Sequence, residues 1–345
     1  MLGWSRWLWW RLYMIVYGRI PRVLGLLSQK GLPGVWEALY FKVRHPLRTA
    51  RPRGASYRLI DNVNGFRMLV DATDRGIAQE LRLFGVHEPL ATQLIKSFVR
   101  PGDCVLDIGA NIGYYALLLS QLVGERGAVL AVEPHPGNFR LLCQNLRLNR
   151  VDNVWVAQAA VAATEGTAQL EVSHASNWHS LVQSGLRPPG RAITVATITV
   201  DRIRQLWGRP ISLMRMDTEG YEGHILQGAK RTIAEDRPAL VVEVHPAFLG
   251  PEGGLQFLEE LLAAGYESRY VVLRSDDVPW HRSRHIVREF SLSHLLLQRN
   301  LFRARQAFTL FLEPAERAAY PRSMEGIRPV GCDEKPSATP EKLAA

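Results

Sequence analysis

The chain has 345 residues, 47% hydrophobic and 22% charged, which are ordinary values for a globular protein and exclude a wholly disordered one. This length allows one large or two modest domains with a sizeable buried core. The cysteines Cys104, Cys143 and Cys332 are odd in number and form no Cys-x-x-Cys pair, so neither a disulfide framework nor a zinc site is indicated. A reducing cytoplasm fits this cysteine usage best.

The net charge of +9 is concentrated in residues 1–58, which hold eleven Lys or Arg and a single acid, Glu37. The rest of the chain carries a net charge near zero, so nucleic-acid binding by the body of the protein is not expected. Four of the nine tryptophans lie in the first ten residues, and aromatic rings mixed with arginines favour a membrane–water interface. The charge-free run at 12–18 is far shorter than the ~20 residues of a membrane span, and no signal-peptide cleavage site follows it. We expect residues 1–58 to form a basic, Trp-rich helical arm on an anionic inner membrane surface, or equally a helix that packs on the body or on a second subunit.

The first elements of the body follow from turns and periodicity. Residues 57–73 contain two short apolar segments around Asn64-Gly65 and predict a β-hairpin. A helix is expected at 89–98. Residues 104–108 form an apolar run, and the helical spacing that begins at Tyr114 predicts strand, tight turn and helix in succession.

The remaining pattern alternates between strands and helices. We expect buried strands at 128–133, 153–159, 211–216, 239–244, 266–273 and 308–312, and helices at 135–148, 221–234 and 256–264. Extended segments at 167–172 and 192–200 flank a polar stretch, 173–180, that could reach over a cofactor. Residues 274–305 have a weak apolar pattern and are left unassigned. The alternation predicts a doubly wound, mostly parallel α/β sheet.

The turn after the first central strand indicates the cofactor. A dinucleotide fold needs Gly-x-Gly-x-x-Gly to bind a pyrophosphate, whereas this turn reads Asp107-x-Gly109-x-x-x-Gly113, with a carboxylate that would repel phosphate. That carboxylate suits S-adenosylmethionine, which carries an ammonium and a sulfonium group. Glu133 ends the next strand, where a ribose diol would be bound. The two carboxylates predict a nucleoside cofactor without phosphates; the alternative is an ordinary turn whose acids cap strands.

A second group of polar residues lies at the ends of later strands. Asp217, Glu219 and Glu222 occur in Asp-Thr-Glu-Gly-Tyr-Glu, and Glu243 and His245 end the next strand with a spacing of two. Methyl transfer to oxygen requires alignment of donor and acceptor and removal of a proton from a hydroxyl. His245 is the best base by its ordinary pKa and Asp217 by its position. Binding of Mg²⁺ by Asp217 and its neighbours is an alternative, as is a capping role for Glu219 and Glu222.

Several ordered blocks resemble a known family. They are Val-Leu-Asp-Ile-Gly-Ala-Asn-Ile-Gly-Tyr-Tyr (105–115), Ala-Val-Glu-Pro-His-Pro-Gly-Asn-Phe (131–139), Leu-Met-Arg-Met-Asp-Thr-Glu-Gly-Tyr-Glu (213–222), Leu-Gln-Gly-Ala (226–229) and Arg-Pro-Ala-Leu-Val-Val-Glu-Val-His (237–245). Together they closely resemble the FkbM family of S-adenosylmethionine-dependent methyltransferases, over roughly residues 86–273.

The resemblance implies a Rossmann-like, seven-stranded class I methyltransferase sheet with an antiparallel last strand. It also implies O-methylation of a hydroxyl on a sugar, glycolipid, polysaccharide or polyketide-like metabolite. By resemblance, Asp107, Gly109, Asn111 and Gly113 would border the methionine half of the cofactor and Glu133 would hold the ribose. Glu88 matches an acidic position that precedes the first block in the family, and we place it with the cofactor-binding residues. Asp217, Glu219 and His245 are the expected catalytic residues from their positions and chemistry. Relatives usually carry Lys at the position of Arg215, which keeps the charge but not the shape.

The resulting domain plan has four parts: the arm (1–58), the hairpin and connector (59–85), the methyltransferase domain (86–315) and a disordered tail (316–345). We expect a cytoplasmic S-adenosylmethionine-dependent O-methyltransferase, peripheral on the inner membrane. It would act on a small-molecule, glycan or glycolipid acceptor and bind no nucleic acid; Mg²⁺ is the weaker cofactor candidate. An alternative is a non-catalytic membrane-associated scaffold that retains the fold. An NAD-dependent oxidoreductase would need the glycine pattern that is absent.

Overall fold

A computed structural model describes residues 57–74, 77–172, 180–181, 191–275, 284–303 and 307–318. The chain divides into two compact units, residues 1–54 with 274–286 and residues 55–273 with 287–345. Apart from the strand ends at 274–275 and 284–286, the described residues all belong to the second unit. The expected arm, polar stretch and tail lie almost entirely outside the described residues. No helix within the described ranges combines the length and apolar character needed to cross a bilayer.

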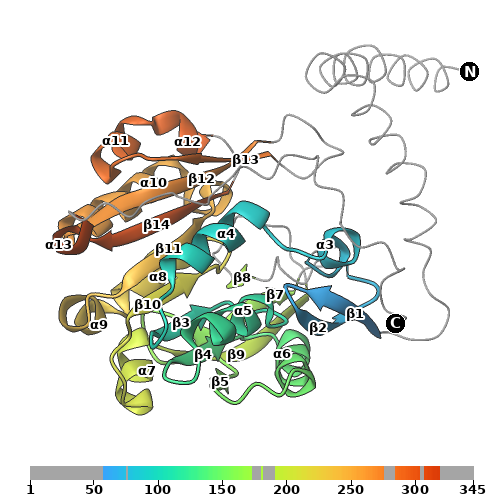
Figure 1. Ribbon diagram of the computed structural model, residues 1–345. Helices are drawn as coiled ribbons and strands as arrows, with labels where there is room; N and C mark the ends of the chain where they lie inside the picture. Colours follow the sequence, from blue (N-terminus) through green and yellow to red (C-terminus); the bar gives the residue numbers. More distant parts are fainter. Residues whose placement is uncertain are drawn as a thin grey trace, which may run out of the picture. The chain divides into compact units, whose positions relative to one another are not determined.

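The largest sheet has eight strands, in the order β13-β12-β14-β11-β10-β3-β4-β5 (Figure 1). Strands β11, β10, β3, β4 and β5 pair in parallel, whereas β14 is antiparallel to both of its neighbours, β11 and β12. The bounds are β3 Cys104–Ile108, β4 Ala128–Val132, β5 Val154–Ala157, β10 Leu213–Met216, β11 Ala239–Val244, β12 Tyr266–Ser275, β13 Arg284–Arg288 and β14 Phe308–Pro314. The predicted mostly parallel sheet is therefore confirmed.

The predicted number of seven strands is wrong by one. The additional strand is β13, which lies in the segment 274–305 where the apolar pattern was too weak to assign an element. β14, the last strand within the described residues, runs antiparallel to its neighbours, as expected. β5 was expected to be buried, but within the described residues it is an edge strand paired with β4 alone, and its Trp155 is 44% exposed.

Helices cover the two faces of the sheet. Alternate strand residues face opposite cores, so Val105 of β3 lies in one core and Leu106 in the other. The first core takes residues from β1 (Tyr57–Val63), β2 (Phe66–Asp71), α3 (Ile77–Phe84), α4 (Pro89–Phe98), α5 (Tyr114–Val123) and α6 (Pro136–Leu148). The second takes residues from α7 (Val200–Trp207), α8 (Glu222–Gln227), α10 (Pro246–Ala263), α11 (Leu292–Leu297) and α12 (Arg299–Arg303).

Some elements differ from the sequence-based expectation. The helix expected at 221–234 is two short helices, α8 and α9 (Lys230–Glu235), which meet at Gly228. The extended segments around the polar stretch form a second sheet in the order β6-β9-β7-β8, with bounds Ala160–Val161, Arg191–Ile198, Gly166–Val172 and Ser180–Leu181. The remaining short helix, α13 (Ala315–Ala318), follows β14.

Asn145 of α6 connects the hairpin β1–β2 to the turn after β3. Its Oδ1 accepts a hydrogen bond from the Leu69 N–H at 2.6 Å, and its Nδ2 donates to the carbonyl oxygens of Leu69 at 3.0 Å and Ile112 at 2.8 Å. The side chain is wholly buried. One amide thus satisfies polar backbone atoms of two segments far apart in sequence and fixes their distance.

Gly228 and Gly223 provide a matched test of this packing. A Cβ at Gly228 would overlap the carbonyl oxygen of Ala162, whereas one at Gly223, inside α8, would meet no atom within 4 Å. We expect Gly228→Ala to lower the free energy of unfolding by about 1–3 kcal/mol, because the backbone must move to relieve the overlap. Gly223→Ala should be neutral or stabilise by up to about 1 kcal/mol, because alanine favours the helix. Urea unfolding followed by circular dichroism measures both, and equal destabilisation would contradict the described packing.

Candidate functional site

The turn after β3 depends on two glycines with left-handed backbone. Gly109 has φ 79° and packs so closely on the end of β10 that a Cβ would overlap the carbonyl oxygen of Asp217. Gly113 has φ 92° and directly precedes α5, where a Cβ would lie 2.8 Å from a methyl carbon of Leu142. Asn111 between them also has positive φ, at 52°. The Asp-x-Gly-x-x-x-Gly pattern therefore produces the tight turn for which it was identified.

A cavity with roughly 600 Å³ of empty space, including its opening to solvent, lies at the carboxyl ends of these strands. Gly109, Asn111 and Glu133 line it from the ends of β3 and β4, and Asp217 and Glu219 line it from the end of β10. The cavity therefore brings together residues from both groups that the sequence indicated. Leu170 and Leu181 of the second sheet form a further, apolar part of the wall, which sequence reasoning did not anticipate.

Glu133 is held by two backbone donors. Its carboxylate accepts hydrogen bonds from the N–H groups of Asn111 and His135, each at 2.9 Å. Burial, which outweighs these hydrogen bonds, raises the pKa of Glu133 to about 7, and the nearby charge of Asp107 acts in the same direction. Glu133 therefore changes its charge near neutral pH.

Asp107 and Arg215 form a buried ion pair between neighbouring strands. They are register partners in β3 and β10, and Arg215 Nη1 donates to Asp107 Oδ1 at 3.0 Å. Burial raises the pKa of Asp107, and the charge and hydrogen bond of Arg215 oppose that rise. The Asp107 side chain is fully buried and lies beside the cavity lining rather than in it.

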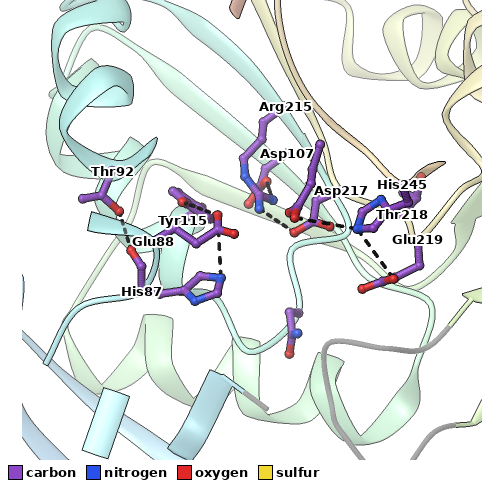
Figure 2. A network of polar contacts seen from close by, with 12 residues as sticks. His87, Glu88, Thr92, Asp107, Tyr115, Arg215, Asp217, Thr218, Glu219 and His245 are labelled. Atoms are coloured by element: carbon purple, nitrogen blue, oxygen red, sulfur yellow. Dashed lines mark hydrogen bonds and ion pairs between the residues drawn. The ribbon is translucent and has the colours of Figure 1, made fainter. Parts of the chain in front are cut away.

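Arg215 also reaches Asp217 and Tyr115. Its Nη2 donates to Asp217 Oδ2 at 2.8 Å, and its guanidinium carbon lies 3.9 Å from the centre of the Tyr115 ring. Figure 2 shows Arg215 together with its two partners, Asp107 and Asp217. Sequence reasoning noted Arg215 only as a departure from the family. A charged residue inside an otherwise apolar strand was the signal for its central position.

Glu88 lies on the other side of Tyr115. The Tyr115 hydroxyl donates to Glu88 Oε2 at 3.1 Å, and Glu88 has a left-handed backbone, φ 43°, directly before α4. Glu88, Tyr115, Arg215 and Glu243 border a second cavity, which has room for about one water molecule. Glu88 was placed among the cofactor-binding residues, but it borders this small cavity and not the large one.

His245 is surrounded by carboxylates. Its Nε2 lies 3.6 Å from Glu219 and 3.7 Å from Glu243, and its Nδ1 lies 3.4 Å from Glu222. Burial alone would lower the pKa of His245, but the charge of Glu219, the hydrogen bond with Glu222 and the charge of Glu243 raise it well above its usual range. These carboxylates favour the protonated ring, so the ordinary pKa that made His245 the best base in the sequence does not apply.

Glu222 holds the loop after β10 in shape. Its Oε1 accepts from the N–H groups of Thr218 at 3.3 Å and Gly220 at 3.1 Å, and from the Thr218 hydroxyl at 3.2 Å. Glu219 and Gly220 between them have left-handed φ values of 54° and 95°. Glu222 is wholly buried, so it is a buried anchor of the loop and not a solvated helix cap.

Three described side chains are candidate ligands for Mg²⁺. Within the described ranges, Asp217, Glu243 and His245 offer ligand atoms within 4.8 Å of one another. A histidine must be neutral to bind a metal, whereas the contacts of His245 with carboxylates favour the protonated ring. The arrangement therefore favours an imidazolium at this position.

The residues present fit S-adenosylmethionine. Asp107 Oδ2 and Asn111 Oδ1 are buried acceptor atoms for which the described part of the chain supplies no hydrogen-bond partner. A buried acceptor without a partner is unfavourable, and a ligand ammonium group is a suitable donor. Glu133 faces the same cavity with a carboxylate that ribose hydroxyls can donate to.

A family model and one curated protein match parts of this chain. Residues 107–268 match the family model described as a methyltransferase FkbM domain. Protein-L-isoaspartate O-methyltransferase 1 from Archaeoglobus fulgidus is 38% identical over 58 residues, which are 17% of this chain and only 27% of that relative.

Two solved structures show a partial likeness to this chain. Methyltransferase FkbM from Methylobacillus flagellatus KT is 15% identical, with a TM-score of 0.37, over 64% of this chain and 50% of that one. Fibrillarin from Aeropyrum pernix, solved with bound S-adenosyl-L-methionine, is also 15% identical, with a TM-score of 0.37, over 75% of this chain and 95% of that one. From the family match, residues 107–268 of this chain form a methyltransferase FkbM domain.

Proposed function

We propose that this protein transfers a methyl group from S-adenosylmethionine to a hydroxyl of a sugar, glycolipid, polysaccharide or polyketide-like acceptor. One observation carries the proposal. A single cavity is lined by Asn111 and Glu133, which suit the cofactor, and by Asp217 and Glu219, which can accept a proton. Cofactor groups and a proton acceptor that share one cavity are what transfer to a hydroxyl requires.

The proposed division of roles follows the two sides of the cavity. Of the residues that line the cavity, Glu133 accepts hydrogen bonds from the ribose and Asn111 from the ammonium group. Asp107 does not line the cavity but lies directly behind it, two residues before Gly109, and Oδ2 is its free acceptor for the ammonium group. When bound, S-adenosylmethionine supplies an electrophilic methyl group, which the acceptor oxygen takes while the carbon–sulfur bond breaks. Asp217 takes the proton of the acceptor hydroxyl, so that the new ether oxygen is neutral.

Asp217 is the preferred base because of its surroundings. Its Oδ2 is fixed by Arg215 at 2.8 Å, and the residue lines the cavity. The pKa of His245 is raised well above its usual range, which favours the protonated ring and makes His245 the poorer base. We assign His245 the role of a cation that orients Glu219 and Glu243, at 3.6 Å and 3.7 Å.

The titration of Glu133 predicts pH-dependent cofactor binding. The pKa of Glu133 is about 7 in the ligand-free protein, and a ribose that donates hydrogen bonds favours the ionised form. Below pH 7 the carboxyl must lose a proton on binding, so the affinity for S-adenosylhomocysteine should fall by up to about tenfold per pH unit. Calorimetry between pH 5.5 and 8 measures this slope. Glu133→Gln should bind more weakly and with a smaller slope, whereas an unchanged slope would rule out Glu133 as its source.

The proton-transfer role of Asp217 predicts a selective loss of activity. Asp217→Asn keeps the shape of the side chain but cannot accept the proton, so the rate should fall by about 10²–10⁴-fold. Methyl-labelled S-adenosylmethionine and fractions of a cell extract provide the assay, with the labelled fraction also revealing the acceptor class. The affinity of this variant for S-adenosylhomocysteine is the control and should change little. Labelling at the rate of the unaltered protein would remove Asp217 from the mechanism.

We further propose that the basic, Trp-rich residues 1–58 bring the enzyme to an anionic membrane surface, where a lipid-linked acceptor would lie. Eleven cationic side chains and several tryptophans support this location. The full chain should sediment with phosphatidylglycerol vesicles, and a chain without residues 1–30 should do so less. Equal sedimentation of the two proteins would argue against membrane binding by the arm.

A further inference from the structure

Arg215 occupies an unusual position for a cation. It lies in the middle of the sheet, in β10 between β3 and β11, and is only 5% exposed. A buried guanidinium is unfavourable unless its N–H groups are paired with acceptors of opposite charge. Its two terminal nitrogens each have one, Asp107 for Nη1 and Asp217 for Nη2.

The guanidinium orientation is fixed from three directions. The two carboxylates hold the edge of the planar group, and the Tyr115 ring lies against its face, 3.9 Å away. Tyr115 is itself held by its hydrogen bond to Glu88 at 3.1 Å. Because the fork is planar and rigid, fixing the guanidinium also fixes the two carboxylates it binds.

Only one oxygen of Asp107 is used in this arrangement. Oδ1 accepts from Arg215, and Oδ2 is buried without a hydrogen-bond partner in the described part of the chain. A neutral neighbour in place of Arg215 would leave a fully buried carboxylate without a counter-ion, which favours the protonated form. The protonated form is a poor acceptor for an ammonium group.

We propose that Arg215 is a positioning residue that keeps Asp107 charged through Oδ1, so that Oδ2 can bind the ammonium group of S-adenosylmethionine, while the same guanidinium orients Asp217 toward the reacting hydroxyl. The inference rests on the proposed function, because it needs that cofactor. It also explains why an arginine, and not a lysine, occupies position 215. A lysine is a point charge that can neutralise one carboxylate, whereas the fork of Arg215 holds two at once.

Two ligands separate this role from a general effect on the fold. S-adenosylhomocysteine carries the ammonium group, and 5′-methylthioadenosine shares its adenosine and thioether but lacks the amino acid. Arg215→Met should weaken S-adenosylhomocysteine by at least about tenfold, the loss of one charged hydrogen bond, and change 5′-methylthioadenosine by less than about threefold. Arg215→Lys should recover most of the lost affinity, because a cation again faces Asp107.

Arg204→Met is the matched control. Arg204 also pairs with an aspartate, Asp236 at 2.7 Å, but it lies in α7 and its side chain is 27% exposed. It lines neither cavity. This variant should bind both ligands like the unaltered protein. Thermal unfolding of every variant accompanies the calorimetry, so that a loss of folded protein is recognised.

A double variant keeps the inference testable if Arg215→Met folds poorly. Asp107→Asn removes the charge that Arg215 supports, and Arg215→Met combined with Asp107→Asn buries no unpaired Asp107 carboxylate. If Arg215 acts on the cofactor through Asp107, the double variant should bind S-adenosylhomocysteine as Asp107→Asn alone does, within about threefold. Additive losses from the two substitutions would overturn the inference.

The outcomes separate the inference from the proposed function. If the unaltered protein binds neither ligand, the proposed function fails. If it binds S-adenosylhomocysteine and Arg215→Met binds it equally well, the function stands and the positioning role is wrong. An equal loss of both ligands in Arg215→Met, with normal folding, would likewise contradict a role directed at the ammonium group.

Discussion

The site depends on one buried ion pair between neighbouring strands. Arg215 and Asp107 lie opposite each other in register, both nearly inaccessible to solvent. Removing one member of such a pair costs about 3–5 kcal/mol, because the other charge stays buried without a partner. The pair therefore constrains the alignment of β3 with β10, and with it the approach of Gly109 to the end of β10 and the width of the cavity between them.

Most acids of the site lie close to one of two cationic side chains. Arg215 pairs with Asp107 and Asp217, and His245 lies among Glu219, Glu222 and Glu243. The carboxylates in these two groups outnumber the cations, and Glu133 adds a further acid that titrates near pH 7. The described lining of the large cavity holds Glu133, Asp217 and Glu219 and no Lys or Arg, so the cavity favours a ligand with positive charge over one with phosphates. A sulfonium cofactor meets this condition, and a dinucleotide does not.

Much of this arrangement could be predicted because it is local. The turn from Asp107 to Gly113 needs glycines that the sequence displays, and β11 is a continuous apolar run whose bounds, Ala239–Val244, were predicted without error. Features that depend on distant contacts were missed. Gly228 divides a predicted helix because it packs on Ala162, and β13 exists only as a partner of β12.

For single residues too, local features could be predicted from the sequence, whereas features that depend on distant contacts could not. The position of Arg215 beside Asp107 depends on strand register between residues 108 positions apart, which no local pattern encodes. The charge of His245 depends on burial and on three carboxylates, so the ordinary pKa of histidine was a poor guide. The position of Asp217 depends only on its place at the end of a strand, and the sequence predicts that place.

The amide of Asn145 has a consequence for the segment that precedes the family match. It joins β2 to the turn after β3 through Leu69 and Ile112, although the matched domain begins only at residue 107. The same Asn145 side chain binds both the turn and the hairpin. A ligand that orders the turn must therefore also make local unfolding of the hairpin less frequent. The hairpin is thus thermodynamically part of the same unit as the matched domain, and its amide protons should exchange more slowly when the turn is occupied.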